Sequence, residues 1–226
     1  MNPKDIARYI DHTQLKPDAG EGHIAQLCRE AIEYSFYSVC VNSCWAGYCA
    51  EALKGSDVKL AVVAGFPLGA MDTESKAFEA RRAVEAGADE IDMVMNVGFL
   101  KSENNGDLLG DIKAVRKASG KGVLLKVIIE TALLSGDEKI AACKAAVEGG
   151  ADFVKTSTGF SKGGATVEDV ALMRSVVGPE IGVKASGGIR SYEDAVKMIE
   201  AGATRLGASS GISIVTGNAG GEEYQF

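Results

Sequence analysis

Short apolar segments alternate with longer amphipathic segments along the whole chain. Eight short runs have the apolar character of buried strands, and they are Ile10–Leu15, Ser38–Val41, Leu60–Phe66, Ile91–Asn96, Val123–Ile129, Phe153–Ser157, Gly182–Ala185 and Arg205–Ser209. Between them, apolar residues recur at helical spacing in Ile24–Ala31, Phe78–Val84, Ile140–Val147 and Val196–Ile199. Strict alternation of strand and helix predicts a parallel sheet with right-handed crossovers. Eight such units predict an α/β fold whose sheet closes into a (β/α)8 TIM barrel.

One sequence motif recurs where a predicted helix ends and the next strand begins. Glu85–Asp92, Glu148–Lys155 and Glu200–Gly207 each place a glycine two positions after the glutamate and then continue into a strand. Such a glycine ends a helix because it adopts a left-handed conformation easily. Thr166 and Ser191 are each followed by aspartate three residues later, a pattern typical of helix starts. No Gly-x-Gly-x-x-Gly follows the first strand, which argues against a dinucleotide-binding sheet.

The two ends of the chain fall outside these units. Pro3–Arg8 predicts a short helix that plugs the N-terminal end of the barrel. The last ten residues are rich in glycine and acidic side chains, a composition typical of flexible tails. We therefore expect one barrel domain over residues 1–216 and a flexible tail over residues 217–226.

Composition narrows the classes of partner. The 226 residues include 24 Lys and Arg against 31 Asp and Glu, which gives a formal net charge of −7. This balance argues against nucleic acid and against an anionic membrane as partners. The first residues contain no apolar secretion signal, and no apolar run reaches the roughly 18 residues of a membrane span. We therefore expect a cytoplasmic protein.

The cysteines and histidines argue against a metal centre. The five cysteines, at positions 28, 40, 44, 49 and 143, form no Cys-x-x-Cys pair. The two histidines, His12 and His23, show no ligand spacing. We predict buried, reduced thiols, no metal and no cofactor. So few histidines also weaken any metal-dependent or serine–histidine mechanism.

Three lysines interrupt predicted strands at a constant interval. Lys126, Lys155 and Lys184 lie 29 residues apart, about the length of one strand-and-helix unit. Lysine is rarely buried unless it is paired or has lost its proton. Each lysine on its own could pair with a carboxylate or extend to the rim. Three equivalent lysines on successive strands instead indicate a site that uses amine chemistry.

Two aspartates interrupt predicted strands in the same way. Asp11 and Asp92 should face the barrel interior together with the three lysines, near the strand ends where barrel active sites lie. A lysine attacks a carbonyl as the free amine, so its pKa of about 10.4 must fall to near 7, which takes about 4 kcal/mol. A second ammonium about 4 Å away supplies about 4 kcal/mol at an effective dielectric constant near 20. A neighbouring lysine is therefore sufficient to activate the nucleophile.

Glycine- and serine-rich segments end the last units. Ser186–Arg190 and Gly207–Gly211 occupy the positions where this fold holds phosphate through backbone N–H groups. Gly159–Gly164, which contains Lys162, forms either a third wall of the pocket or a lid over it. Together the segments predict a phosphorylated substrate.

Six motifs resemble those of the deoxyribose-phosphate aldolase family. They are Ile10–Pro17, Phe66–Gly69, Glu90–Asn96, Leu125–Thr131, Phe153–Phe160 and Val183–Arg190, and they follow in order over residues from about 5 to 216. The resemblance implies a class I aldolase that works without a metal. It also implies reversible cleavage of 2-deoxy-D-ribose 5-phosphate into acetaldehyde and D-glyceraldehyde 3-phosphate.

The same resemblance implies roles for individual residues. It puts the Schiff-base lysine at Lys155, the activating lysine at Lys184 and the proton-relay carboxylate at Asp92. It assigns binding of the phosphosugar to Gly159, Gly187, Gly188, Gly207, Ser209 and Ser210, and support of the site to Asp11, Lys126 and Thr158. Members of the family can end in a tyrosine near the site. Here Tyr224, followed by Gln225 and Phe226, either shuttles the enamine proton or is a solvated end without a role.

Other functions remain as alternatives on the same fold. A phosphosugar isomerase or epimerase would keep the phosphate loops but would not need a buried lysine pair. A thiazole-synthase-type cyclase would share the Schiff-base lysine but lack the relay of Asp92 and Lys184. A non-catalytic phosphosugar-binding barrel would use the lysines for anion attraction alone. For the aldolase we expect small-molecule phosphosugar and aldehyde substrates and a homo-oligomer, either a dimer or a tetramer.

Overall fold

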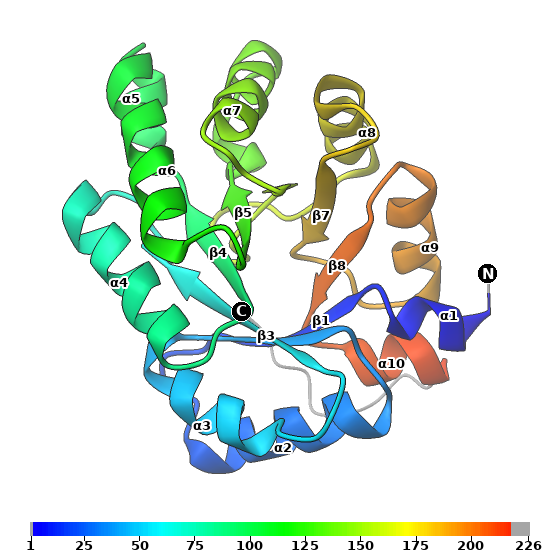
Figure 1. Ribbon diagram of the computed structural model, residues 1–226. Helices are drawn as coiled ribbons and strands as arrows, with labels where there is room; N and C mark the ends of the chain where they lie inside the picture. Colours follow the sequence, from blue (N-terminus) through cyan, green and yellow to red (C-terminus); the bar gives the residue numbers. More distant parts are fainter. Residues whose placement is uncertain (1, 218–226) are drawn as a thin grey trace.

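The computed structural model describes residues 2–217, which form a closed barrel of eight parallel strands inside a ring of helices (Figure 1). The strands follow one another around the barrel in chain order, and β8 pairs with β1 to close it. They are β1 Ile10–Gln14, β2 Ser38–Val41, β3 Lys59–Ala64, β4 Glu90–Val94, β5 Leu124–Ile128, β6 Phe153–Lys155, β7 Gly182–Ser186 and β8 Arg205–Ala208. The predicted (β/α)8 barrel is therefore confirmed.

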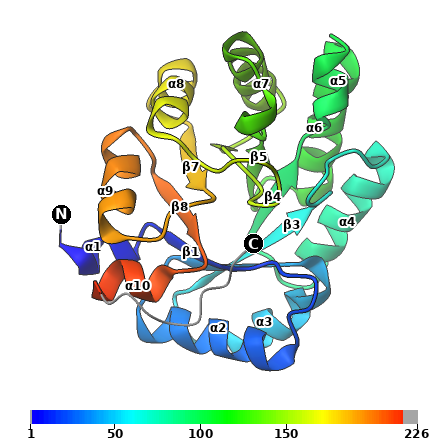
Figure 2. The same cartoon turned by 180° about the vertical axis from the view of Figure 1, so that it is seen from behind.

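The connections between the strands contain the helices, and Figure 2 shows the same ring from behind. The α-helices are α1 Pro3–Ala7, α2 Glu21–Glu33, α3 Ala46–Ala52, α4 Thr73–Glu85, α5 Val97–Lys101, α6 Asn105–Ser119, α7 Gly136–Glu148, α8 Val167–Val177, α9 Tyr192–Glu200 and α10 Gly211–Thr216. Two 3₁₀ turns, η1 Ser43–Trp45 and η2 Thr131–Leu133, complete the set within residues 2–217. None of these helices combines the length and hydrophobicity that crossing a membrane requires.

The predicted ends of the strands agree with the structure to within about two residues, whereas the apolar helical segments mark only the interiors of α2, α4, α7 and α9. The hydroxyls of Thr166 and Ser191 accept the backbone N–H of Asp169 and Asp194, each at 3.1 Å, and so begin α8 and α9. Several strands end up to two residues earlier than predicted. β6, for example, ends at Lys155, because the chain turns there into a loop over the barrel mouth.

The barrel interior is divided into an apolar part and a charged part. An apolar cluster on the β1–β3 side contains Leu15, Cys40, Ala61 and Val63, with Phe66 packed against it. The charged residues described below enter mainly from β4 to β8. The larger apolar core lies between the strands and the surrounding helices, as expected when a parallel sheet is covered on its outer face.

Two apolar residues of the helical pattern are not buried, and one prediction about a cysteine is wrong. Phe78, the first residue of the apolar spacing in α4, is 55% exposed and Arg81 lies over its ring, while Lys76 takes an inner position. Val147 of α7 is exposed in the same way. Cys44 was expected to be buried but is exposed, because it lies in the surface turn η1, whereas the other four cysteines are buried and free.

The N-terminal helix exists but does not plug the barrel. α1 lies beside α10 in the outer ring in both views (Figures 1 and 2). The N-terminal end of the barrel is closed instead by side chains. The guanidinium of Arg205 lies 3.4 Å from the ring centroid of Tyr37 and 5.3 Å from that of Phe153, and these residues begin or precede strands. These side chains fill this end of the barrel and leave no room there for a helix.

Candidate active site

Asp92 lies at the centre of a buried charged cluster inside the barrel. Its Oδ2 accepts hydrogen bonds from the ammonium groups of Lys155 and Lys184, each at 2.8 Å, and its Oδ1 accepts one from Lys126 at 2.6 Å. The strand register explains this convergence, since Asp92 is paired with Lys126 across β4 and β5, and Lys155 with Lys184 across β6 and β7. The sequence therefore brings the three regularly spaced lysines to one carboxylate.

A second layer of carboxylates lies deeper in the barrel. Asp11 accepts hydrogen bonds from Lys184 and from Arg205, the latter at 2.9 Å. Glu90 accepts one from Lys126 at 2.5 Å and is 3.1 Å from the guanidinium of Arg205. These residues are at most 3% exposed. Each carboxylate of the cluster therefore contacts at least two cations.

The charges of this cluster do not balance. Within residues 2–217, four cationic side chains meet three carboxylates in the barrel interior, and they are Lys126, Lys155, Lys184 and Arg205 against Asp11, Glu90 and Asp92. If all seven are charged, one positive charge is in excess. A buried excess charge is expensive, so the cluster favours the loss of one proton from a lysine.

The pKa directions identify that lysine as Lys155. Burial lowers its pKa, and the ammonium of Lys184 lowers it further, against the opposing effect of Asp92. Burial also acts to lower the pKa of Lys184, but Asp11 and Asp92 outweigh it and raise this pKa. The pKa of Lys126 is raised too, because Asp92 and Glu90 outweigh its burial. Burial is thus the largest cause of the shift at Lys155, and the neighbouring ammonium contributes in the same direction.

The carboxylates stay ionised in this setting. Burial by itself would raise the pKa of Asp92, but Lys126, Lys155 and Lys184 hold it well below its usual range. Burial also opposes ionisation of Asp11, whose pKa is lowered chiefly by Lys184 and Arg205. A proton lost from Lys155 is therefore not simply taken up by these aspartates.

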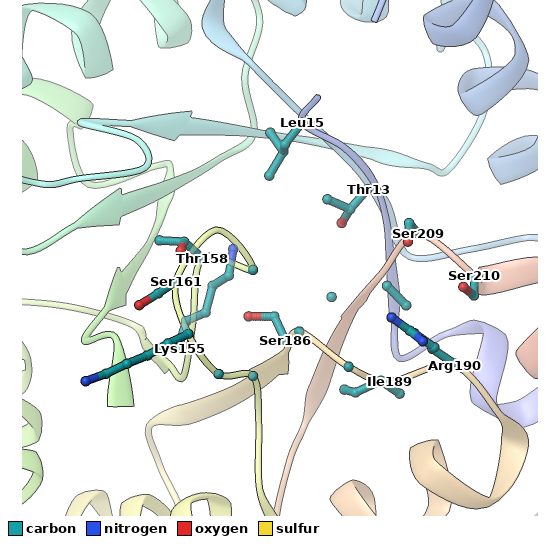
Figure 3. Close-up of a pocket in the computed structure, with 18 residues that line it drawn as sticks. Thr13, Leu15, Lys155, Thr158, Ser161, Ser186, Ile189, Arg190, Ser209 and Ser210 are labelled. Atoms are coloured by element: carbon teal, nitrogen blue, oxygen red, sulfur yellow. The ribbon is translucent and has the colours of Figure 1, made fainter. Parts of the chain in front are cut away.

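Lys155 is the member of the cluster that reaches the adjoining cavity. The cavity has a volume of about 200 Å³ and lies over the C-terminal ends of the strands (Figure 3). Its lining includes Thr13, Leu15, Lys155, Thr158, Gly159, Ser161, Lys162, Ser186, Gly187, Gly188, Arg190, Gly207, Ser209 and Ser210. Asp11, Asp92, Lys126 and Lys184 lie beneath it and do not line it. An aldehyde in the cavity would therefore meet the amine of Lys155 first.

The predicted phosphate residues line the same cavity. Figure 3 shows Ser209 and Ser210 across the cavity from Thr158 and Ser161. Two cationic side chains, Lys162 and Arg190, also belong to its lining. The site thus combines hydroxyls, cations and glycine-rich backbone, which is the chemistry that recognises a phosphate.

Two glycines permit close approaches that the site needs. A Cβ on Gly207 would lie 2.9 Å from the Cβ of Ser186 and 3.1 Å from the Cε of Lys184, so the lysine stem passes where a side chain would stand. A Cβ on Gly164 would lie 2.3 Å from the carbonyl oxygen of Gly187. The loops after β6 and β7 therefore pack backbone against backbone.

The structure brings all but one of the predicted site residues to this region. Tyr224 lies outside the described residues. The sequence reasoning missed Glu90 and Arg205. Glu90 shares the inward face of β4 with Asp92, and this two-residue alternation was the available signal. Within the described chain, no group of three His, Cys, Asp or Glu side chains could hold a metal ion.

Comparisons with known proteins agree with this geometry. The model of a family described as DeoC/LacD family aldolase matches residues 6–221. The chain is 60% identical over 221 residues to Deoxyribose-phosphate aldolase 1 of Bacillus licheniformis, which covers 98% of this chain and 99% of that protein. It is also 62% identical over 213 residues to Deoxyribose-phosphate aldolase of Brevibacillus brevis, and the matched region covers 94% of this chain and 96% of that protein.

A solved structure gives the same result. The chain is similar to deoxyribose phosphate aldolase of Aeropyrum pernix, with a TM-score of 0.88 and 36% identity over 95% of this chain and 91% of that one. The fold and the cavity at its strand ends define a barrel enzyme, and the relatives make it an aldolase. The chain belongs to the DeoC/LacD aldolase family.

Proposed function

We propose that this aldolase reversibly cleaves 2-deoxy-D-ribose 5-phosphate into acetaldehyde and D-glyceraldehyde 3-phosphate through a lysine Schiff base. The observation that carries the proposal is the buried amine of Lys155, whose pKa is lowered, in a cavity that also contains phosphate-binding chemistry. The names of the relatives support the same substrate. No metal or other cofactor takes part in the proposed reaction.

The reaction begins at Lys155. Its neutral amine attacks C1 of the open-chain sugar, and loss of water from the carbinolamine gives an imine. The hydroxyl at C3 then loses its proton, the C2–C3 bond breaks, and its electron pair moves to C2 and the imine nitrogen to form an enamine. D-glyceraldehyde 3-phosphate leaves at this step. Protonation of the enamine carbon and hydrolysis of the new imine release acetaldehyde and free Lys155.

Asp92 and Lys184 lie where they can transfer these protons. Asp92 contacts the side-chain nitrogens of Lys155 and Lys184, and in our proposal it moves protons to and from the reacting carbon through Lys184 and a water molecule. Lys126 supports the arrangement because it holds Oδ1 of Asp92 and is paired with Glu90. Asp11 supports it by pairing with Lys184.

The phosphate end positions the sugar over Lys155. Ser209 and Ser210, with the backbone of Gly187 and Gly188, bind the 5-phosphate in this proposal, and Gly159 and Gly207 shape the pocket. Thr158 supports the loop that carries Gly159. Binding energy from the phosphate would orient the aldehyde for attack, which accounts for a large rate effect without any new chemistry at C1.

One pair of assays tests the proposed function. An alcohol dehydrogenase and NADH should report acetaldehyde release from 2-deoxy-D-ribose 5-phosphate, and borohydride with acetaldehyde should leave a covalent two-carbon adduct on the protein. A phosphosugar isomerase or a non-catalytic binding barrel would give neither result. Absence of both aldehyde release and adduct in the wild-type protein would contradict the proposal.

We also propose an oligomeric state and a cellular location for this enzyme. The Aeropyrum pernix relative is described as having a tetrameric structure, and a homo-oligomer, either a dimer or a tetramer, is our proposal for this chain. Sedimentation of the purified protein tests it. With a net charge of −7, nucleic acid is not expected as a partner. The small phosphorylated substrate suits an enzyme of the cytoplasm.

A further inference from the structure

Glu130 directly follows β5 in a backbone conformation that glutamate seldom adopts. Its φ of 58° and ψ of 65° lie in the left-handed region, which is unfavourable for a residue with a Cβ. Its side chain is 4% exposed, although a glutamate is seldom buried without a cationic partner. Such strain persists where the surrounding structure requires it, often beside a functional site.

The carboxylate of Glu130 makes its contacts with one residue of the loop after β6. Oε2 accepts both the backbone N–H of Thr158 at 3.2 Å and the hydroxyl of Thr158 at 2.5 Å. The same hydroxyl oxygen accepts the backbone N–H of Phe160 at 3.1 Å. Oε1 is buried and has no hydrogen-bond partner among residues 2–217. The contacts of this carboxylate therefore stabilise the first turn of the loop.

The backbone on either side of Glu130 is bound to the same segment. The N–H of Ile129 donates to the carbonyl of Lys155 at 3.0 Å, and the N–H of Thr131 donates to the carbonyl of Thr156 at 2.9 Å. The chain from Lys155 to Thr158 is thus attached to the end of β5 at three successive points. The left-handed turn at Glu130 is what lets its side chain make the third attachment.

We propose that Glu130 is a positioning residue, which fixes the pocket wall formed by residues 158–164 relative to Lys155. This wall contributes Thr158, Gly159, Ser161 and Lys162 to the cavity. Glu130 does not line the cavity, so it acts through Thr158. The inference rests on the proposed function, because the wall lines the pocket that takes the phosphosugar while Lys155 performs the chemistry.

This role predicts a separation of binding from chemistry. Losing the carboxylate should displace this wall and weaken binding of the phosphorylated substrate, and a loss of binding shared by ground state and transition state raises KM without lowering kcat. Lys155 is held separately by its backbone hydrogen bonds and by Asp92. Attack of Lys155 on a small unphosphorylated aldehyde should therefore change little.

Two substitutions at position 130 and one matched control test the proposal. Glu130→Gly removes the carboxylate and also relieves the backbone strain, whereas Glu130→Gln keeps an oxygen that can accept the Thr158 N–H. Glu103 has a φ of 56° and is exposed outside the cavity, so Glu103→Gly makes the same chemical change at a similar positive φ. The measurements are KM and kcat for 2-deoxy-D-ribose 5-phosphate, borohydride trapping of acetaldehyde, and hydrogen exchange of residues 158–164.

For Glu130→Gly we expect KM to rise by about tenfold or more, with kcat and acetaldehyde trapping within about threefold of wild type. Exchange of residues 158–164 should become faster. Glu130→Gln should recover most of the lost affinity, and Glu103→Gly should match the wild type. If Glu130→Gly fails to fold, Thr158→Val is the alternative variant, because it removes one of the two donors to the carboxylate. It should raise KM and make hydrogen exchange of residues 158–164 faster.

Unchanged KM and unchanged exchange in Glu130→Gly would overturn the proposal, as would a loss confined to kcat. The hydrogen-exchange measurement does not depend on turnover. If the wild-type protein released no aldehyde, the proposed function would fail, while faster exchange in Glu130→Gly would still show that this carboxylate holds the wall.

Discussion

Two regions within residues 2–217 bury lysine, and they do so differently. In the helical layer, the ammonium of Lys76 on α4 lies 2.6 Å from Oδ2 of Asp111 on α6 and 3.0 Å from the carbonyl oxygen of Gly69, and Thr73 donates to the same carboxylate. Both charged side chains are fully buried. Inside the barrel, four cations of the described chain share three carboxylates, and one of these cations reaches a cavity.

Burial alone does not mark a lysine as catalytic. Burial is the largest cause of a lowered pKa at both Lys76 and Lys155, so neither burial nor the direction of the pKa shift separates structure from chemistry. Lys76 has a carboxylate of its own and no access to the cavity. Lys155 shares one carboxylate with two other ammonium groups and opens onto the substrate site. Charge imbalance and access together distinguish the candidate nucleophile.

The largest effect should come from removing the amine that reaches the cavity. Lys155→Leu should lower kcat for 2-deoxy-D-ribose 5-phosphate by about 10³-fold or more, because no other lysine of the charged cluster lines the cavity. It should not lower the melting temperature, since it also removes the excess positive charge. Steady-state kinetics and thermal melting check both statements. Substantial residual turnover would remove Lys155 from its proposed role.

The opposite pattern should follow from breaking the pair in the helical layer. Lys76→Met leaves Asp111 buried without its cation and should lower the free energy of unfolding by about 3–5 kcal/mol. Activity at a temperature where the variant is folded should stay close to that of the wild type. Chemical denaturation measures the loss. The double variant Lys76→Met/Asp111→Leu is the control, because it removes both charges and should recover much of the stability.

A change of pH dependence should follow from altering the charge balance within the barrel. Lys184→Leu removes an ammonium that lowers the pKa of Lys155, and it frees Asp92 to hold the Lys155 ammonium. The pKa of Lys155 should therefore rise, and the neutral amine should form at higher pH. We expect the acid limb of the kcat/KM profile to move upward by about one pH unit or more. An unmoved limb with near-normal turnover would contradict this account.

The smallest effect concerns the end of the chain. We propose that residues 217–226 are a tail separate from the barrel domain, and truncation after Gly217 should leave the melting temperature nearly unchanged. If Tyr224 shuttles the enamine proton, the truncated protein and Tyr224→Phe should both lose about tenfold or more in turnover. Activity within about twofold of the full-length protein would leave Tyr224 without a catalytic role.

The sequence predicted the features that depend on local periodicity. Alternating strands and helices indicated the barrel, and the inward phase of Asp11, Asp92 and the three lysines followed from two-residue alternation. Features that depend on contacts between distant elements were missed. Lys76 takes an inner position on α4 because Asp111 of α6 lies opposite, and helical spacing alone pointed to Phe78.

The active site likewise combines residues that the sequence predicted with residues that it did not. The spacing of the lysines was visible in the chain, and three lysines against two aspartates already left one positive charge in excess. Arg205 and Glu90 were missed, because they join the cluster through the closure of the barrel. Glu130 was likewise hidden. Its role depends on a left-handed backbone turn and on contacts with Thr158, 28 positions away in the sequence.

The central claim is that charge imbalance and burial make Lys155 the neutral amine of the site. Borohydride trapping of acetaldehyde on the wild-type protein, followed over pH and located by mass spectrometry, tests it most directly. We expect the two-carbon label on Lys155, with half-maximal trapping well below the ordinary lysine pKa of about 10.4. Label on Lys126 or Lys184, or trapping that rises only near the ordinary lysine pKa, would contradict the account.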